Sequence, residues 1–343
     1  MSKESLTIAD QVHFFIDNLE ESLKYVPDVT FLDCKNILFC GMGGSAIAGD
    51  ITSDYAYQNL DKFIYVLKFP ILPSWSDCHT LAIISSYSGN TVETLQMYEQ
   101  ALAHECKIVV MTSGGILEQR ARADNKQIIK LPKNLHPRQA LGYLIGYAVS
   151  VISSVSSIDL RSAIKSAIPN LKTYRDLLEK EDAANPAIIL AERLVNKIPI
   201  ICADDDMKSV ALRWKTQLNE NSKIVAFCCS AQEVICDSLT DQHNRNLADN
   251  FILLTISHHQ YDNTNTSVCE LESLISAADG CNVTTQRIDF SGSSQIESIL
   301  KAIMLSDHVS LHAARLKNVD PAEVKAIIEL KELIQNRLNR TTG

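Results

Sequence analysis

The sequence predicts an α/β protein made of two mainly parallel sheets, each flanked by helices. Short apolar runs rich in β-branched residues alternate with longer stretches of helical spacing. Such alternation is typical of βαβ units around a parallel sheet. The pattern occurs in both halves of a chain of 343 residues. This length is too great for one average domain and fits two of ordinary size.

The first half contains the more regular alternation. Each predicted strand is a short run dominated by Ile, Val, Leu or Phe, and each predicted helix repeats apolar residues every three or four positions. The strands are expected at 36–39, 63–67, 81–85, 107–112 and 127–131. The helices are expected at 11–24, 45–57, 92–104 and 138–153.

The second half repeats the theme after a polar helical stretch at 158–181. Its strands are expected at 199–203, 224–227, 251–256 and 285–288, and its helices at 208–219, 267–278, 295–316 and 321–337. The last helix has Asp320 as a favourable N-cap and Pro321 at its first position. We therefore predict a first domain at 1–157, a helical connector at 158–190 and a second domain at 191–343.

Composition narrows the class of protein. The chain is 46% hydrophobic and 21% charged, with a formal net charge of −9. These values are typical of a globular protein and argue against nucleic acid or an anionic membrane as a partner. We expect no membrane span and no signal peptide. Ten scattered cysteines without a CxxC pair favour a reducing cytoplasm over disulfides or zinc.

Two turns of small residues carry the clearest chemical signal. They read CGMGGSA at 40–46 and SSYSGNT at 85–91, and each follows a predicted strand and opens a predicted helix. Such turns offer backbone N–H groups, hydroxyls and the positive end of a helix dipole, which together suit a phosphate. Two turns at one edge of a parallel sheet can hold one anion from two sides. The sequence therefore predicts a site for a phosphorylated small molecule.

The corresponding turn of the second half is acidic. It reads ICADDD at 201–206, and three carboxylates would repel a phosphate. We favour their serving as acids at the start of the predicted helix from Lys208 over a metal site, because no further ligand cluster flanks them in sequence. His308 and His312 stand one helical turn apart but lack a third ligand in sequence. No metal and no cofactor are expected.

Several segments together resemble one family, the bifunctional phosphoglucose/phosphomannose isomerases, which are double sugar-isomerase (SIS) domain proteins of archaea and bacteria. The resemblance extends over nearly the whole chain. The segments are GMGGSA at 41–46, SYSGNT at 86–91, PR at 137–138, RWKTQLNENSK at 213–223, VDP at 319–321 and IELK at 328–331.

The resemblance implies two flavodoxin-like domains, a homodimer and a metal-independent isomerase. Its expected reaction interconverts glucose 6-phosphate or mannose 6-phosphate with fructose 6-phosphate through a cis-enediol. Carried over by position, Arg138 would stabilise the charged intermediate, Glu220 would be the base and Lys331 would assist at the ring oxygen. The groups expected to hold the sugar phosphate or to let the backbone approach it are Gly43, Gly44, Ser45, Ser86, Ser88 and Thr91.

The residues themselves leave simpler interpretations open. A carboxylate such as Glu220 can move a proton between C1 and C2 when partial burial raises its pKa, but many helix-terminal glutamates are merely solvated. Arg138 at a helix start suggests a nearby anion, or else a surface ion pair. Ser88 and Thr91 also suit simple N-caps. Lys331 also suits a solvated helix face.

One segment departs from the family pattern. The family has a Pro-Glu-Leu-Asn-His-Asn-Glu stretch whose His, from the partner subunit, opens the sugar ring. Here 232–238 reads QEVICDS, so Cys236 falls at the His position, and His243 or His312 would have to replace it. A sugar-phosphate sensor that does not turn its ligand over is therefore the alternative function. A nucleotide-dependent enzyme is disfavoured, because 41–46 matches neither GxGxxG nor GxxxxGK[ST].

Overall fold

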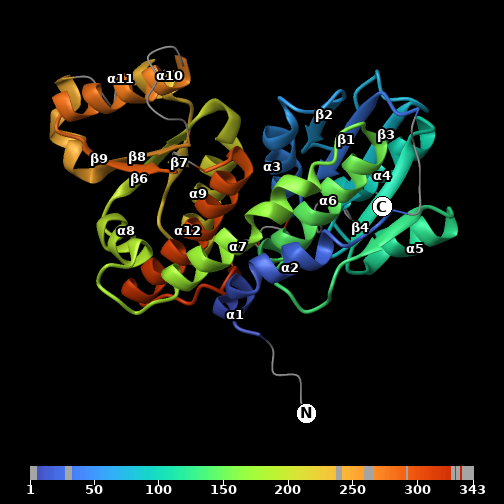
Figure 1. Ribbon diagram of the computed structural model, residues 1–343, viewed down its shortest axis with the longest axis horizontal. Coiled ribbons are helices and arrows are strands. Elements are labelled where there is room, and N and C mark those ends of the chain that lie inside the picture. Colours follow the sequence, from blue (N-terminus) through green and yellow to red (C-terminus); the bar gives the residue numbers. More distant parts are fainter. Residues whose placement is uncertain are drawn as a thin grey trace.

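The computed structural model folds into two lobes, one around each sheet (Figure 1). It describes residues 6–27, 33–236, 242–258, 266–290 and 293–325, together with Glu329 and Leu333. All strand pairings between the described strands are parallel, which confirms the predicted fold class.

The first sheet has the strand order β2-β1-β3-β4-β5. All five predicted strands are confirmed to within two residues. They are β1 (Asn36–Gly41), β2 (Phe63–Leu67), β3 (Thr80–Ser85), β4 (Lys107–Thr112) and β5 (Gln127–Lys130). β3 is buried along its whole length, as expected for an apolar run in a sheet covered by helices on both faces.

The second sheet has the strand order β7-β6-β8-β9. Its strands are β6 (Ile198–Ala203), β7 (Phe227–Cys228), β8 (Phe251–Ser257) and β9 (Thr284–Asp289). The strand predicted at 224–227 is wrong except at its last residue. The amides of Ile224 and Ala226 donate to Leu218 O and Asn219 Oδ1 of the preceding helix, so they are not available to a neighbouring strand.

The helices of the first lobe differ from the prediction mainly at their starts. The helix predicted at 11–24 is two helices that meet at Phe14, and short 3-10 turns at Gly43–Ser45 and Pro137–Gln139 precede two others. α5 was not predicted, because its polar sequence has little helical periodicity. The helices are α1 (Ile8–His13), α2 (Phe15–Ser22), α3 (Ile47–Ala56), α4 (Val92–Ala103), α5 (Gly115–Ala123) and α6 (Leu141–Val155).

The remaining helices include two that the sequence did not predict, α8 and α10. α8 begins with Asn185, whose side chain accepts from Ala187 N, and with Pro186 at its first position. The helix expected to begin at Pro321 does not begin there, since 321–324 are not helical; most of 326–337 lies outside the described residues. The helices are α7 (Arg161–Leu178), α8 (Pro186–Leu194), α9 (Lys208–Asn221), α10 (Ala231–Cys236), α11 (Thr266–Gly280) and α12 (Gln295–Leu316).

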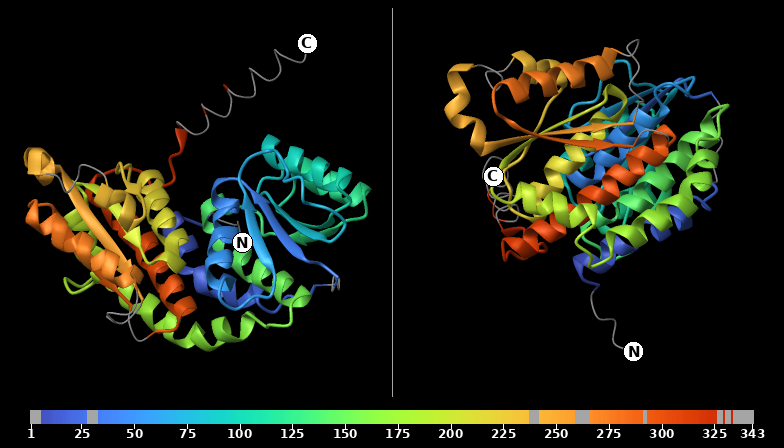
Figure 2. Two further views of the ribbon diagram at one scale, coloured as in Figure 1. Left: turned by 90° about the horizontal axis from the view of Figure 1, so that it is seen from above. Right: turned by 60° about the vertical axis from the view of Figure 1, so that its left-hand side comes forward.

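Helices α7, α9 and α12 join the two lobes into one structure. α12 packs against α7, α8 and α9, while α7 also contacts α2 and α6, and α3 contacts α9 (Figures 1 and 2). One continuous apolar core includes residues of both lobes, with Trp214 of α9 fully buried against α12. The boundaries at 157 and 190 stay a prediction. No described helix is both long and apolar enough to cross a membrane.

Candidate active site at the edge of the first sheet

The two turns of small residues lie side by side, at the carboxyl ends of the neighbouring strands β1 and β3. Tyr87 N in the second turn donates to Ser45 Oγ in the first over 3.2 Å. Gly43 and Gly89 have φ values of +50° and +69°, which suit glycine. Nothing lies within 4 Å of the point where a Cβ would stand on Gly43, so the first turn exposes its backbone to an incoming group.

The hydroxyls of the second turn bond within the turn. Ser86 Oγ donates to Thr91 Oγ1 over 3.1 Å and accepts from Gly89 N, while exposed Ser88 accepts from Asn90 N. Thr91 is the N-cap of α4 but its side chain makes no cap hydrogen bond. Simple N-capping by Ser88 and Thr91 is therefore wrong as an account of these side chains.

A third turn, which the sequence analysis missed, supports the second. It follows β4 and reads SGG at 113–115. Ser113 Oγ donates to Tyr87 O over 2.6 Å, and a Cβ on Gly89 would stand 1.8 Å from Gly114 O. Ser-Gly-Gly directly after a predicted strand was the available signal, since it repeats the position of the other two turns.

Arg138 connects the glycine turn to the second lobe. A Cβ on Gly44 would stand 3.4 Å from Arg138 Cα, so the two backbones are in contact. The guanidinium donates from Nε to Asn221 Oδ1 over 2.8 Å, from Nη1 to Glu220 Oε2 over 3.3 Å and from Nη2 to Pro321 O over 2.5 Å. Arg138 is 6% exposed. An ordinary surface ion pair is therefore wrong as an interpretation.

The charges around Arg138 are close enough to affect one another. Burial lowers the pKa of Arg138, and the nearby Glu220 carboxylate opposes that change. Glu220 stands at the end of α9 with its side chain 32% exposed, so it is half-buried as expected. Lys223 donates to the carbonyls of Glu220 and Glu323, and burial together with Arg138 lowers its pKa. Arg138 and Lys223, which donate to the carbonyls of Pro321 and Glu323, thus hold 321–323 beside Glu220.

Only part of the predicted ring-opening machinery falls within the described structure. Lys331 lies outside the described residues, as do the side chains of Cys236 and His243. His312 is partly buried on α12, where Arg315 and His308 lower its pKa further than burial alone. His136 directly precedes Pro137 and Arg138. Burial and then Arg138 lower its pKa, while Asp320 and Glu220 act in the opposite direction.

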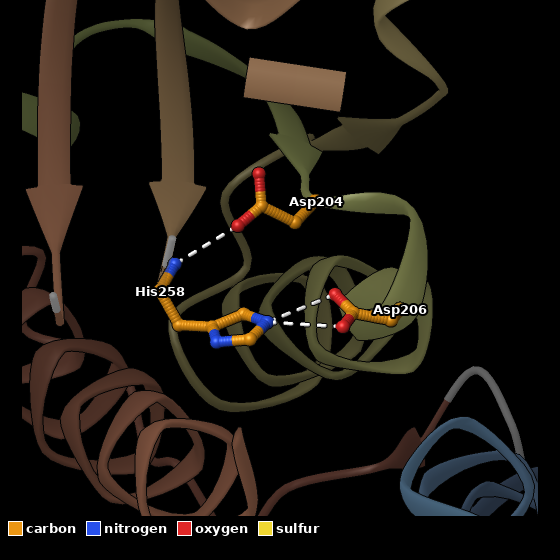
Figure 3. A group of neighbouring side chains, drawn as sticks. All are labelled: Asp204, Asp206 and His258. Carbon is orange, nitrogen blue, oxygen red and sulfur yellow. Dashed lines mark hydrogen bonds and ion pairs between the residues drawn. The ribbon is translucent and has the colours of Figure 1, made fainter. Parts of the chain in front are cut away.

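The acidic turn of the second lobe meets a histidine from β8 (Figure 3). Ligand atoms of Asp204, Asp206 and His258 lie within 4.8 Å of one another, so a further possible ligand stands beside the acids although none flanks them in sequence. His258 follows β8, in the position that the second turn has after β3. His258 lies beside the acids because β6 and β8 are neighbouring parallel strands that end at the same edge of the sheet. The spacing of these residues in the sequence did not reveal this proximity.

The contacts in this cluster are hydrogen bonds. His258 Nε2 lies 3.0 and 3.1 Å from the two Asp206 oxygens, and His258 N and Ser257 Oγ donate to Asp204 Oδ2. Asp204 Oδ1 has no hydrogen-bond partner among the described residues, and Figure 3 shows this oxygen pointing away from Asp206 and His258. These three residues are where a cation would bind in this lobe, but the contacts do not require one.

Asp205 and Asp206 lie in the 3-10 turn that leads into α9, so acids do stand at this helix start, but they do not cap it. The N-caps of the 3-10 turn and of α9, Asp204 and Met207, make no side-chain cap hydrogen bond in the described structure. Ser209 N, in the first turn of α9, instead donates to Asp54 Oδ2 of α3 over 2.8 Å. The cap therefore comes from the other lobe.

Comparisons with known proteins give a consistent result. Residues 183–334 match the family model described as the bacterial phospho-glucose isomerase C-terminal SIS domain. The chain is 32% identical to a bifunctional phosphoglucose/phosphomannose isomerase from Thermoplasma acidophilum, over 97% of both chains. It is 30% identical to the protein of the same name from Aquifex aeolicus, over 87% of this chain and 90% of the relative.

A solved structure has the same fold. It is the C-terminal domain of glucosamine-fructose-6-phosphate aminotransferase from Francisella tularensis, with a TM-score of 0.70 and 13% identity. The match covers 94% of this chain and 99% of that one. At this identity the likeness shows the fold alone.

Proposed function

Because this chain belongs to the bifunctional phosphoglucose/phosphomannose isomerase family, we propose that it interconverts glucose 6-phosphate or mannose 6-phosphate with fructose 6-phosphate. The observation that carries the proposal is the position of Arg138. Its backbone contacts the glycine turn and its side chain bonds to Glu220. A phosphate-binding edge, a cation and a carboxylate base thus belong to one connected site.

In the proposed reaction, Ser45, Ser86, Ser88 and Thr91 hold the phosphate together with the first-turn amides of α3 and α4. Once the ring is open, Glu220 takes the C2 proton of the aldose and returns it to C1, while the proton of the C2 hydroxyl passes to the C1 oxygen, giving the ketose. The negative charge of the cis-enediolate between these steps faces the Arg138 guanidinium, which is already oriented before the reaction.

The remaining features of the proposal follow from the family. Rotation about the C2–C3 bond would let one base serve both the gluco and manno epimers. Lys331 would act at the ring oxygen. The enzyme would use no metal and would act in the cytoplasm as a homodimer. No disulfide joins the nine cysteines whose side chains the structure describes. The scattered cysteines of the sequence support the proposal of a reducing compartment.

The first test is Glu220→Gln, which keeps the shape of the side chain and removes the base. We expect turnover to fall at least about 10²-fold while hexose 6-phosphate binding is largely retained. The measurement is steady-state isomerisation of fructose 6-phosphate, with binding by calorimetry. A variant with unchanged turnover would exclude Glu220 as the base.

Glu118→Gln is the matched control. Glu118 also pairs with cations, Arg122 and Lys130, but it lies on α5 outside the site. Its loss is expected to leave turnover within about twofold, because exposed ion pairs of this kind contribute little.

The alternative function is a sensor that binds hexose 6-phosphates without isomerising them. It is favoured by the departure at 232–238, where Cys236 replaces the family histidine. Calorimetric binding without turnover of any of the three hexose phosphates would support the sensor. Turnover of either fructose-forming pair would exclude it.

A further inference from the structure

Asn221 is a fully buried amide beside the catalytic pair. It is the last residue of α9 and directly follows Glu220. Its Oδ1 accepts from Arg138 Nε over 2.8 Å, and its Nδ2 donates to Ser310 Oγ of α12 over 2.8 Å. Neither the sequence motifs nor the relatives assign Asn221 a role.

The orientation of this amide is determined by its partners. A serine hydroxyl has one proton to donate. Ser310 Oγ donates that proton to Asp307 O over 2.7 Å, so toward Asn221 it acts as an acceptor. The Nδ2 group of Asn221 must then face Ser310, and the carbonyl oxygen must face Arg138.

The position of Asn221 is also fixed by packing between α9 and α12. Two turns earlier on α9, Arg213 makes a bidentate ion pair with Asp307, with Nη2 3.0 Å from both carboxylate oxygens. Both side chains are at most 2% exposed. Because this pair and the Asn221–Ser310 bond join the same two helices, α9 has little freedom to rotate or slide.

We propose that Asn221 is a positioning residue for isomerisation, whose locked amide holds the Arg138 guanidinium at Glu220. The role rests on the proposed function. Glu220 and Asn221 are neighbours on one helix turn, so α9 places the base and the support of the cation together. A cation fixed before the enediolate forms stabilises that charge without reorganising.

The test compares kcat, KM and the hydrogen-exchange rate of Arg138 Nε–H in Asn221→Leu, which keeps the branching of the side chain and removes its hydrogen-bonding groups. We expect kcat to fall about 10–100-fold and KM to change less than about threefold, because the phosphate contacts remain while the cation is misplaced. In the absence of substrate, the Nε–H proton of Arg138 should exchange with solvent much faster in Asn221→Leu than in the unsubstituted protein. The signal of this proton is identified as the one that is lost in Arg138→Lys.

Asn185→Leu is the matched control. Asn185 is an equally buried amide, 1% exposed, but it bonds only to structural groups: Leu178 O, Lys180 O and Ala187 N, within the described residues. The Asn185→Leu variant is expected to have a lower melting temperature, with kcat and the exchange rate of Arg138 Nε–H unchanged. If Asn221→Leu does not fold, Ser310→Ala replaces it and should raise Arg138 exchange with a smaller fall in kcat.

The outcomes separate this inference from the proposed function. Unchanged Arg138 exchange or unchanged kcat in a folded Asn221→Leu protein would overturn the positioning role. An unsubstituted protein that isomerises no hexose 6-phosphate would overturn the proposed function, while faster Arg138 exchange in Asn221→Leu would still show that Asn221 holds the guanidinium.

Discussion

Arg138 shows how one buried side chain can organise a site. Its three nitrogens reach the Glu220 carboxylate, the buried Asn221 amide and the Pro321 carbonyl, which lie far from Arg138 in the sequence. Since burial of an unpaired guanidinium is costly, removal of any partner is expected to disturb the others.

His136 borders this arrangement and is our candidate for the ring-opening group. It directly precedes Pro137 and Arg138 and responds to the charges of Arg138, Asp320 and Glu220. Burial and Arg138 lower its pKa, so the imidazole is neutral at pH 7 and can accept one proton and donate another. Ring opening requires both transfers.

At the residue scale we therefore predict that His136→Asn slows turnover of cyclic hexose 6-phosphates about tenfold or more. Because the pKa of His136 is lowered, protonation should remove activity only below about pH 6.5, the ordinary value for histidine. This fall of activity at acid pH should be absent when kcat/KM of His136→Asn is measured as a function of pH.

The competing candidates are tested in parallel. If Cys236 occupies the ring-opening position, Cys236→His should raise turnover of the cyclic substrate. If His243→Ala abolishes activity and His136→Asn does not, His243 supplies the group and the prediction for His136 is wrong.

At the scale of elements, the three turns of the first sheet edge depend on one another. Gly89 is the point of closest approach between the second and third turns, and its φ of +69° is unfavourable for other residues. Ser86, Ser88 and Thr91 are held in their positions by this same turn.

Gly89→Ala is expected to lower the free energy of unfolding by about 1–3 kcal/mol, since the added Cβ meets Gly114 O and the backbone is strained. It should also weaken hexose 6-phosphate binding more than tenfold. The measurements are denaturant unfolding and calorimetry.

Gly280→Ala supplies the control for the same chemical change. Gly280 ends α11, is exposed, and has open space where a Cβ would stand. Alanine there should leave stability unchanged or raise it by up to about 1 kcal/mol, with binding intact. Equal effects at both positions would contradict the account of the Gly89 turn.

At the scale of the whole molecule, Asp54 links the lobes. Its carboxylate on α3 accepts from Ser209 N of α9, and Gln295 Nε2 of α12 donates to its carbonyl. Burial raises the pKa of Asp54, and the nearby Asp50 and Asp206 raise it further, whereas the Ser209 bonds oppose this.

The sign of the resulting pH dependence follows from linkage. An acid whose pKa is higher in the folded protein binds its proton more readily when folded, so stability rises as pH falls through the folded pKa toward the ordinary value of about 3.8. Asp54→Asn keeps an acceptor for Ser209 and removes the charge, so it should lack this contribution.

We predict that Asp54→Asn is at least as stable as the unsubstituted protein at pH 7, and that its advantage shrinks as pH falls from 7 to 4. Melting temperatures of both proteins across that range provide the measurement. An advantage that grows with acid would show that the Asp54 carboxylate is favoured in the folded state.

The sequence alone predicted the features that depend on neighbours along the chain. Short β-branched runs identified the strands of both sheets, apart from the shifted β7, because alternation of apolar segments is a local property. The same restriction to local patterns explains which helix features were not predicted. The break at Phe14 and the unpredicted α5, α8 and α10 depend on capping and packing that periodicity does not record.

What the sequence determined about this protein is its α/β class, its two turns of small residues and its family. What tertiary structure decided is which distant groups meet: Arg138 with Glu220 and Asn221, and Asp204 and Asp206 with His258. The conformation of a turn and the hydrogen-bond donors that it offers depend on a few consecutive residues, so they can be predicted from the sequence. Contacts between the turn that carries Arg138, α9 and α12 instead depend on how helices bury their apolar faces, and that packing involves the whole chain.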